Sequence, residues 1–205
     1  MVRTIEDTNL ADIAQAIRAK NGTENKYKPS EMAAAIESLA TGGGGSDEAA
    51  SYLVSNKAGL TSFTFPQGIT KIESFAFYGC SNLVLTELPA TITAIGPSAF
   101  SGCSALAITE LPEGITQVET NSFSSCKGLT TLTIPAGVQY VWTSAFSFCS
   151  NLTEVTFKGT PEEIADNAFN YCNKLTSIKV PWAEGAVAGA PWGATKATIT
   201  YNYTE

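Results

Sequence analysis

The sequence predicts a repeat solenoid of the α/β type, with one parallel sheet and 3₁₀ or helical turns, preceded by a small helical hairpin. Three observations lead to this prediction. Residues of one kind return every 23 positions along most of the chain, apolar residues alternate at strand spacing within each interval, and residues 1–40 follow a helical period instead. One strand and one turn cannot bury their own apolar face, but stacked copies can.

Five kinds of position share the 23-residue interval. Each unit, here called a rung, reads L-x-x-Φ-x-Φ-P, a short loop, Ile or Val, and then Ala or Ser followed by F-x-x-C. The alternating part predicts a strand that ends at the proline, and the last part predicts a tight turn. The ladders are Cys80, Cys103, Cys126, Cys149 and Cys172; Phe77, Phe100, Phe123, Phe146 and Phe169; Leu60, Leu83, Leu106, Leu129, Leu152 and Leu175; Ile72, Ile95, Val118, Val141 and Ile164; and Pro66, Pro89, Pro112, Pro135 and Pro181.

The cysteine ladder has two interpretations. Free cysteine is among the most buried residue types, which predicts a column of buried thiols beside the phenylalanines. The alternative is disulfides or a metal between rungs, whose spacing of about 4.8 Å lies in the range that a disulfide can span. We favour buried thiols because side chains in register point in parallel, five cysteines cannot all pair, and the chain has no C-x-x-C and no histidine.

Three segments are expected from these patterns. Residues 1–40 form a two-helix attachment module, residues 41–50 a Gly-rich linker, and residues 51–205 the solenoid, with rungs starting at 60, 83, 106, 129 and 152. Residues 175–205 form a capping rung in which Val187, Trp192 and Thr195 take the Ile/Val, Phe and Cys positions. A final strand follows, in which Ile199 and Tyr203 belong to an alternating pattern that closes the sheet edge.

Composition excludes several functions. The net charge of −7 argues against binding nucleic acid or anionic lipid, and the absence of histidine removes catalysis and metal ligation that depend on it. The chain start shows no signal peptide, and no apolar run approaches the ~20 residues that span a bilayer. No pair of carboxylates placed for glycoside hydrolysis is evident. We therefore expect a non-enzymatic protein with no catalytic residues, cofactor, metal or membrane insertion.

Outward-facing aromatic residues are the first candidates for a binding surface. Tyr140 and Trp142 stand where other rungs have charged or small residues, and Phe148 and Tyr171 replace Gly or Ser on adjacent rungs. Tyr and Trp often carry binding energy at interfaces, and rung spacing places the four within about 5–10 Å as one patch. The alternative is that they shield a loop or pack among themselves.

Two further features of the surface leave alternatives open. Leu85 and Ile108 occupy positions that face outward in other rungs, so each is either turned into the core by a bulge, which we favour, or part of an exposed apolar spot. Glu162, Glu163 and Asp166 form a small acidic group that we interpret as a solvated turn, since the oxygen-ligand spacing of a calcium loop is missing.

The repeat pattern resembles the BspA-like (Treponema-type) bacterial leucine-rich repeats from Leu60 to about Tyr203. That resemblance implies a leucine-rich-repeat solenoid and a binding or adhesion protein at a cell surface or outside the cell, with no fixed site residues. The stretch "LADIAQAIRAKNG…KPSEMAAAIESL" resembles a module at the front of tail-associated structural proteins of phages and prophages of Gram-positive bacteria.

Two functions follow from these resemblances. The first is a tail-associated receptor-binding or structural protein that contacts a bacterial cell surface, located on the virion tail. The second is a bacterial surface or secreted adhesin that binds host or neighbour-cell macromolecules. In both, the expected partner is a protein or glycan on a cell surface, and residues 1–40 would attach the chain to a virion tail or to further copies of itself.

Overall fold

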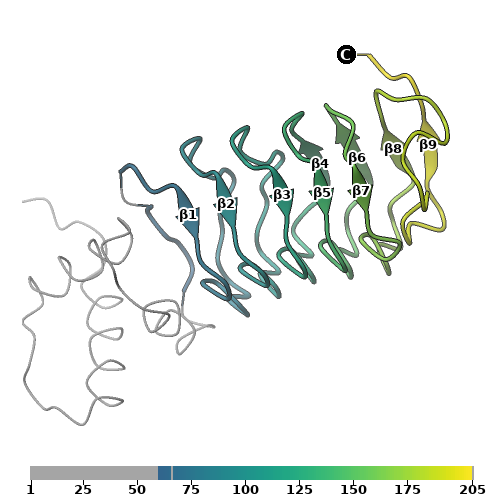
Figure 1. Ribbon diagram of the computed structural model, residues 1–205. Helices are drawn as coiled ribbons and strands as arrows, with labels where there is room; N and C mark the ends of the chain where they lie inside the picture. Colours follow the sequence, from purple (N-terminus) through teal and green to yellow (C-terminus); the bar gives the residue numbers. More distant parts are fainter. Residues whose placement is uncertain (1–59, 66, 205) are drawn as a thin grey trace, which may run out of the picture.

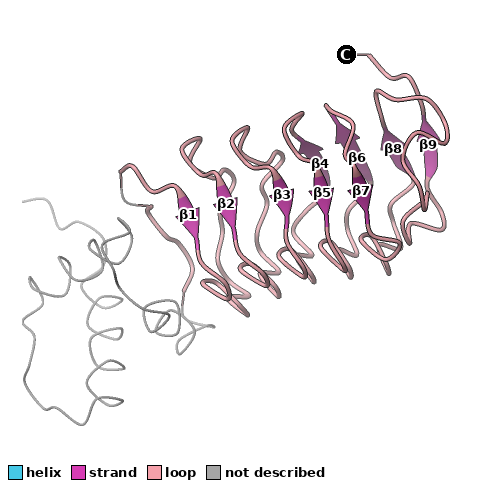
Figure 2. Cartoon of the chain, viewed as in Figure 1, coloured by secondary structure: helices cyan, strands magenta, loops and turns pink. Residues whose placement is uncertain are grey.

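The protein is a stack of similar rungs, seen in a computed structural model that describes residues 60–65 and 67–204 (Figure 1). The described residues contain short strands and turns and no helix (Figure 2). For this part of the chain the solenoid prediction is confirmed, whereas the α/β class and its 3₁₀ or helical turns are wrong. The predicted helical hairpin lies outside the described residues.

Two rows of parallel strands run along the solenoid. In the first row, β1 pairs with β2, and β5 lies between β3 and β7; in the second row, the strand order is β4-β6-β8-β9. The first row comprises β1 (Lys71–Ile72), β2 (Ala94–Ile95), β3 (Gln117–Val118), β5 (Tyr140–Val141) and β7 (Glu163–Ile164). The second row comprises β4 (Thr131–Ile134), β6 (Glu154–Phe157), β8 (Ser177–Lys179) and β9 (Thr198–Thr200).

The strand register confirms the 23-residue period. Lys71 pairs with Ala94 in the first row, and Leu132 pairs with Val155 in the second. The interval changes only in the last pairing, where Ser177 meets Thr198 after 21 residues. The predicted final strand therefore forms as β9, and it ends at Thr200.

The first row of strands lies in segments that the sequence pattern treats as loops. The L-x-x-Φ-x-Φ segment forms a strand from β4 onward, but its earlier copies contribute only a single bridge, between Glu110 and Thr133. In the copy that follows Leu83, both Leu85 and Leu88 are buried. Side chains three positions apart point to opposite faces of a strand, so this copy cannot keep strand geometry while burying both.

The turns that end each rung use alternate amides in different ways. The N–H groups of Tyr78 and Cys80 donate within the turn to the carbonyls of Phe75 and Phe77, at 3.0 Å each. The N–H groups of Phe75, Phe77 and Gly79 donate instead to carbonyls of the next rung. A 3₁₀ helix needs the local bond at every residue, so the demand of the neighbouring rung explains why these turns are not helical.

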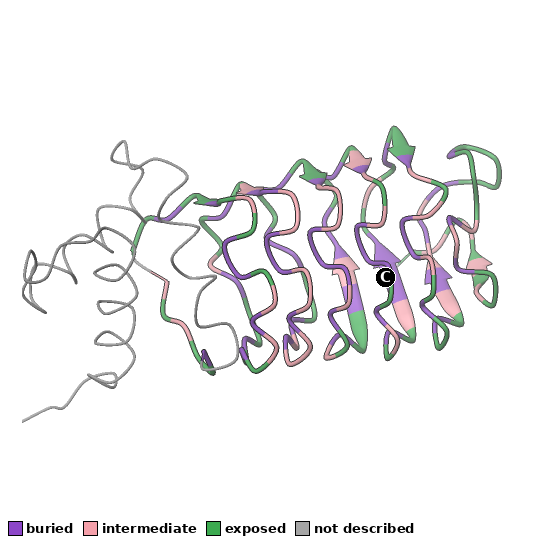
Figure 3. Ribbon diagram, turned by 90° about the horizontal axis from the view of Figure 1, so that it is seen from below, coloured by how far each residue is buried: buried purple, intermediate pink, exposed green. Residues whose placement is uncertain are grey.

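The core is a column of rings flanked by aliphatic side chains (Figure 3). The ladder from Phe77 to Phe169 forms a continuous stack, with centroid distances of 5.1, 5.5, 5.6 and 5.2 Å and ring planes within 10° of parallel. Stacked rings at this spacing contribute beyond the burial of their apolar area.

All five cysteines are buried and free, as predicted. Their thiols also make hydrogen bonds that the sequence pattern did not reveal. Cys103 Sγ donates to the carbonyl oxygen of Phe77 at 3.0 Å, and Cys126, Cys149 and Cys172 make the same bond one rung further on, at 3.0–3.1 Å. Burial raises the pKa of Cys103 to about 12, so the thiol stays protonated and available as a donor.

The capping rung is shorter than predicted. Val187 and Trp192 are buried, but Thr195, expected in the cysteine ladder, is exposed. Ala194 takes that place, since its N–H donates to the carbonyl of Pro191 as Cys80 does to Phe77. The missing residue moves Trp192 one position past the phenylalanine column, and its ring contacts Phe157 and Trp182 instead.

Candidate binding surface

The most exposed aromatic pair lies at the turn corners of two adjacent rungs. Phe148 is 49% exposed and Tyr171 is 54% exposed. Their rings stack on each other, with centroids 4.5 Å apart and planes 15° from parallel. Each ring covers part of its neighbour but leaves about half of its side chain open to solvent, so the two form a continuous aromatic surface.

The backbone at these two positions is one that glycine favours. Phe148 and Tyr171 have φ of 62° and 60°, and the same position in the first two rungs holds Gly79 and Gly102 at 75° and 81°. A side chain in this left-handed region costs on the order of 1 kcal/mol. Two exposed aromatic residues are therefore held where glycine would be less strained, and the contacts of an exposed ring with its neighbour return only part of that cost.

Tyr140 and Trp142 form a second stacked pair in the middle of the first row of strands. Both side chains are half-buried, and their rings are 5.2 Å apart and 5° from parallel. The Tyr140 hydroxyl donates to Glu162 Oε2 at 2.6 Å, and Trp142 Nε1 donates to Gln117 Oε1 at 3.1 Å. The bond to Glu162 raises the pKa of Tyr140, because the carboxylate favours the protonated phenol.

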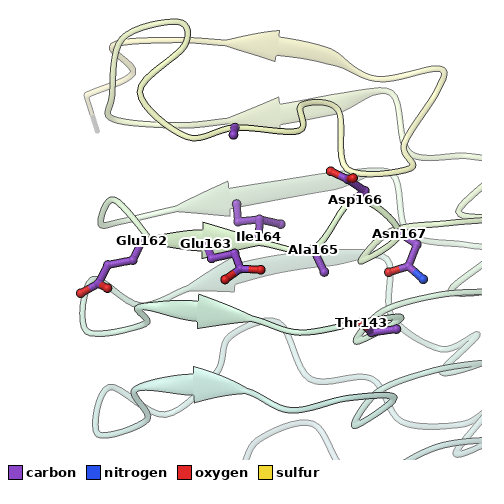
Figure 4. A pocket seen from close by; sticks show the side chains of 8 residues that line it. Thr143, Glu162, Glu163, Ile164, Ala165, Asp166 and Asn167 are labelled. Carbon is purple, nitrogen blue, oxygen red and sulfur yellow. The ribbon is translucent and has the colours of Figure 1, made fainter.

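A hollow lies on either side of this second pair. One, of about 660 Å³, is lined by Glu162 to Asn167, with Thr143 and Ala188 (Figure 4). The other, of about 260 Å³, includes Gln117 in its lining. The acceptors of the Tyr140 and Trp142 hydrogen bonds thus belong to different hollows, which places the ring pair between them. Glu162, Glu163 and Asp166 are exposed, in agreement with a solvated acidic turn.

The four predicted aromatic residues therefore form two pairs. Ring contacts join Tyr140 to Trp142 and Phe148 to Tyr171, and no ring contact links the pairs within the part of the chain that the structure describes. Both interpretations of the sequence contribute, because the rings pack among themselves and still reach solvent.

The sheet-face candidates are a correction. Leu85 is 8% exposed and Ile108 is 1% exposed, whereas Thr86 and Thr109 are exposed. The side chains of Leu85 and Ile108 lie in the core, so the alternative of an exposed apolar spot at these residues is wrong. Turning inward buries two large side chains, and burial of each contributes roughly 1.5–3 kcal/mol.

Sequence reasoning missed a third aromatic group in the first complete turn. Phe75 is 51% exposed, Tyr78 is 41% exposed, and their rings are 5.9 Å apart. Phe75 has φ of 62° and stands where later rungs have Ser98 and Asn121. The comparison of each rung position across copies, applied to Phe148, would have found it.

The arrangement offers contact surfaces rather than reaction chemistry. Among residues 60–65 and 67–204, no three His, Cys, Asp or Glu side chains lie where they could hold a metal ion. None of the described segments is a helix long and apolar enough to cross a membrane. Exposed and half-exposed rings on a rigid stack are the features that can carry binding energy.

A parallel stack with leucine and phenylalanine ladders defines a leucine-rich-repeat protein, a class that typically serves as a scaffold for protein interaction. The chain matches the family model described as BspA type leucine rich repeat region, in six copies over residues 48–181, and it belongs to that family. The resemblance of the repeats is confirmed. The residues that resemble a phage-tail module lie outside the described part.

Two solved structures are similar to this chain. A leucine rich cell surface protein from Faecalibacterium prausnitzii A2-165 is 28% identical, with a TM-score of 0.57 over 62% of this chain and 33% of that one. A leucine rich repeat protein from T. pallidum is 27% identical, with a TM-score of 0.55 over 70% of both chains. This chain thus spans about a third of the F. prausnitzii protein. No curated protein matches it.

Proposed function

We propose that this protein is a non-enzymatic, adhesin-like binding protein that acts at a cell surface and contacts a macromolecule through its exposed aromatic residues. The observation that carries the proposal is the Phe148–Tyr171 pair, which is stacked, about half exposed and held at glycine-favouring φ. Such strain without a compensating gain in packing supports a functional role for these side chains.

The setting at a cell surface is supported by the relatives. The similar F. prausnitzii structure is described as a cell surface protein, and the repeat family is shared. The tail-associated alternative depends on the resemblance of residues 1–40 and has no further support. We therefore place the adhesin-like function first and keep the virion-tail function as the alternative to be tested beside it.

The test is a binding assay with the full chain on intact bacterial cells and on immobilised host matrix proteins. Phe148→Ser combined with Tyr171→Ser replaces both rings by the residue that Ser125 provides at this position, where φ is 61°. If the pair is an interface hot spot, the double variant should bind at least ~10-fold more weakly, because each buried ring typically contributes 1 kcal/mol or more.

A matched control is Phe75→Ser, which removes an equally exposed ring at positive φ from a distant rung. It should leave binding unchanged, with circular dichroism confirming the fold of all variants. Unchanged binding of the double variant would refute the role of the pair. Binding to bacterial cells alone, combined with co-purification of the chain with tail particles, would favour the virion-tail alternative.

A further inference from the structure

We propose that Tyr140 and Trp142, with the two hollows beside them, form a carbohydrate-binding platform for neutral or amino-sugar glycans. This inference rests on the proposed surface-binding function and assigns a ligand class to the second aromatic pair. Tyr140 lies in β5, between Gln117 of β3 and Glu163 of β7 in register, so the platform is at the centre of the three-stranded sheet.

The two rings are held in place before any ligand arrives. The hydrogen bond from Tyr140 to Glu162 and that from Trp142 to Gln117 fix the outer ends of both side chains, and the parallel stack fixes their planes. A ligand that packs on them therefore loses little of its binding energy to ordering the protein, which is the usual cost of using flexible surface side chains.

Planar polar groups surround the platform. The larger hollow presents Glu163, Asp166 and Asn167 from one rung and Thr143 from the preceding one (Figure 4). The smaller hollow adds the oxygens of Thr93, Thr116 and Glu119 to that of Gln117. A ring lying against Tyr140 or Trp142 would thus find hydrogen-bond acceptors on both sides, at the ends of side chains that stand on rigid rungs.

This combination matches the chemistry of a sugar. A pyranose ring has a C–H face that packs on an aromatic ring and equatorial hydroxyl groups that donate to carboxylates and amides. Glu162, Glu163 and Asp166 would repel sulfated or uronic-acid chains at neutral pH. A peptide hot spot needs an apolar pocket, whereas the linings here are largely polar.

Intrinsic fluorescence can report on this platform alone. The chain has three tryptophans, and Trp182 and Trp192 are 5% and 0% exposed, so Trp142 is the indole that a surface ligand can reach. The full chain would be titrated with chitohexaose and with cellohexaose, and with heparin as the polyanionic control. We expect a saturable change with at least one neutral or amino-sugar oligosaccharide and none with heparin.

Two variants separate stacking from folding. Tyr140→Ala should weaken the oligosaccharide affinity at least ~10-fold, whereas Tyr140→Phe, which keeps the ring and loses only the bond to Glu162, should stay within about threefold. The Phe148→Ser/Tyr171→Ser variant should bind oligosaccharide like the parent. A failure of the proposed function therefore appears in that variant and a failure of this inference in Tyr140→Ala.

The inference is overturned by either of two results. One is the absence of a saturable fluorescence change with both oligosaccharides. The other is equal affinity of the parent and the Tyr140→Ala variant. Binding to cells that persists in the Tyr140→Ala variant and survives enzymatic removal of surface glycans would show instead that the pair contacts protein.

Discussion

At the scale of single residues, each cysteine satisfies a carbonyl that the backbone alone satisfies only once. The carbonyl oxygen of Phe100 accepts the N–H of Cys103 within its own turn and the Sγ–H of Cys126 from the next rung. Both lone pairs are thus used in a site closed to water, where an unsatisfied acceptor would cost about 1–3 kcal/mol. This dual role explains why cysteine, rather than alanine, occupies the position in five rungs.

The first prediction concerns thiol reactivity. Because all five thiols are buried and the pKa of Cys103 is raised to about 12, the reactive thiolate is scarce in the folded protein. Iodoacetamide should modify the native chain slowly and should modify five residues in denaturant, as counted by mass spectrometry. A disulfide found by the same method under non-reducing conditions would contradict the ladder of free thiols.

The second prediction concerns alkaline stability. Cys103 has a folded pKa of about 12 against 9.0 for the free thiol. The unfolded chain therefore releases this proton first as the pH rises. The contribution is complete below pH 9, and it is lost between pH 9 and 12 at up to about 1.4 kcal/mol per pH unit.

Cys103→Ser provides the matched control, because a hydroxyl can still donate to Phe77 but does not titrate in this range. The measurement is the free energy of unfolding in urea at pH 8, 9, 10 and 11 for both proteins. The variant should show the shallower decline. Parallel curves would mean that the Cys103 pKa is not raised by folding.

At the scale of elements, the turns are shaped by the need to bond sideways as well as locally. Alternate amides point to the next rung, and left-handed φ at positions such as Phe75 and Gly79 makes this alternation possible. A helix of the same length would keep every amide bond inside the turn, which would remove the lateral bonds that hold neighbouring rungs together. Solenoid stacking and a helical turn therefore compete for the same N–H groups.

The third prediction concerns the phenylalanine column. Phe123 is 1% exposed and lies between the rings of Phe100 and Phe146. Phe123→Ala should lower the free energy of unfolding by about 3–5 kcal/mol, the range for a buried aromatic residue. Trp192→Ala, in the capping rung, should cost less, because an end rung can fray without opening its neighbours.

Hydrogen exchange locates the two losses. In Trp192→Ala, the amides of β9 should lose protection while those of β5 keep it, because Trp192 packs on Phe157 and Trp182 at one end of the stack. In Phe123→Ala, protection should fall on both sides of the substituted rung. Equal losses of stability and equal patterns of exchange in the two variants would count against stacking as the source of stability.

At the scale of the whole molecule, the stack separates structural from binding residues by direction. Phe123 and Cys126 point into one shared column, whereas Tyr140 and Phe148 point out from the first row of strands and from the turn corners. Each rung can therefore change its outward residues without disturbing the ladder, and neighbouring rungs bring such changes together. The stacked pair Phe148–Tyr171 arises in this way, one ring from each of two rungs.

Much of the candidate surface could be found by aligning the rungs of the sequence. That comparison identifies Tyr140, Trp142, Phe148 and Tyr171, because each departs from what the other rungs hold at its position. It also suggests that Leu85 turns inward, since an apolar residue and a polar one appear exchanged. It does not reveal which rings meet, because contacts across rungs depend on side-chain direction and not on sequence interval.

The sequence by itself determined the period, the parallel stacking, the phenylalanine column and the buried thiols of this protein. These follow from apolar side chains that recur at 23 positions and can be buried only by a neighbouring copy. The tertiary structure decided the rest: non-helical turns, strands at Ile72 and its equivalents, the short cap, and two ring pairs in place of one patch. The physical reason is that backbone hydrogen bonds are shared between rungs, and how each amide divides between its own turn and the next rung is settled only when the rungs are stacked.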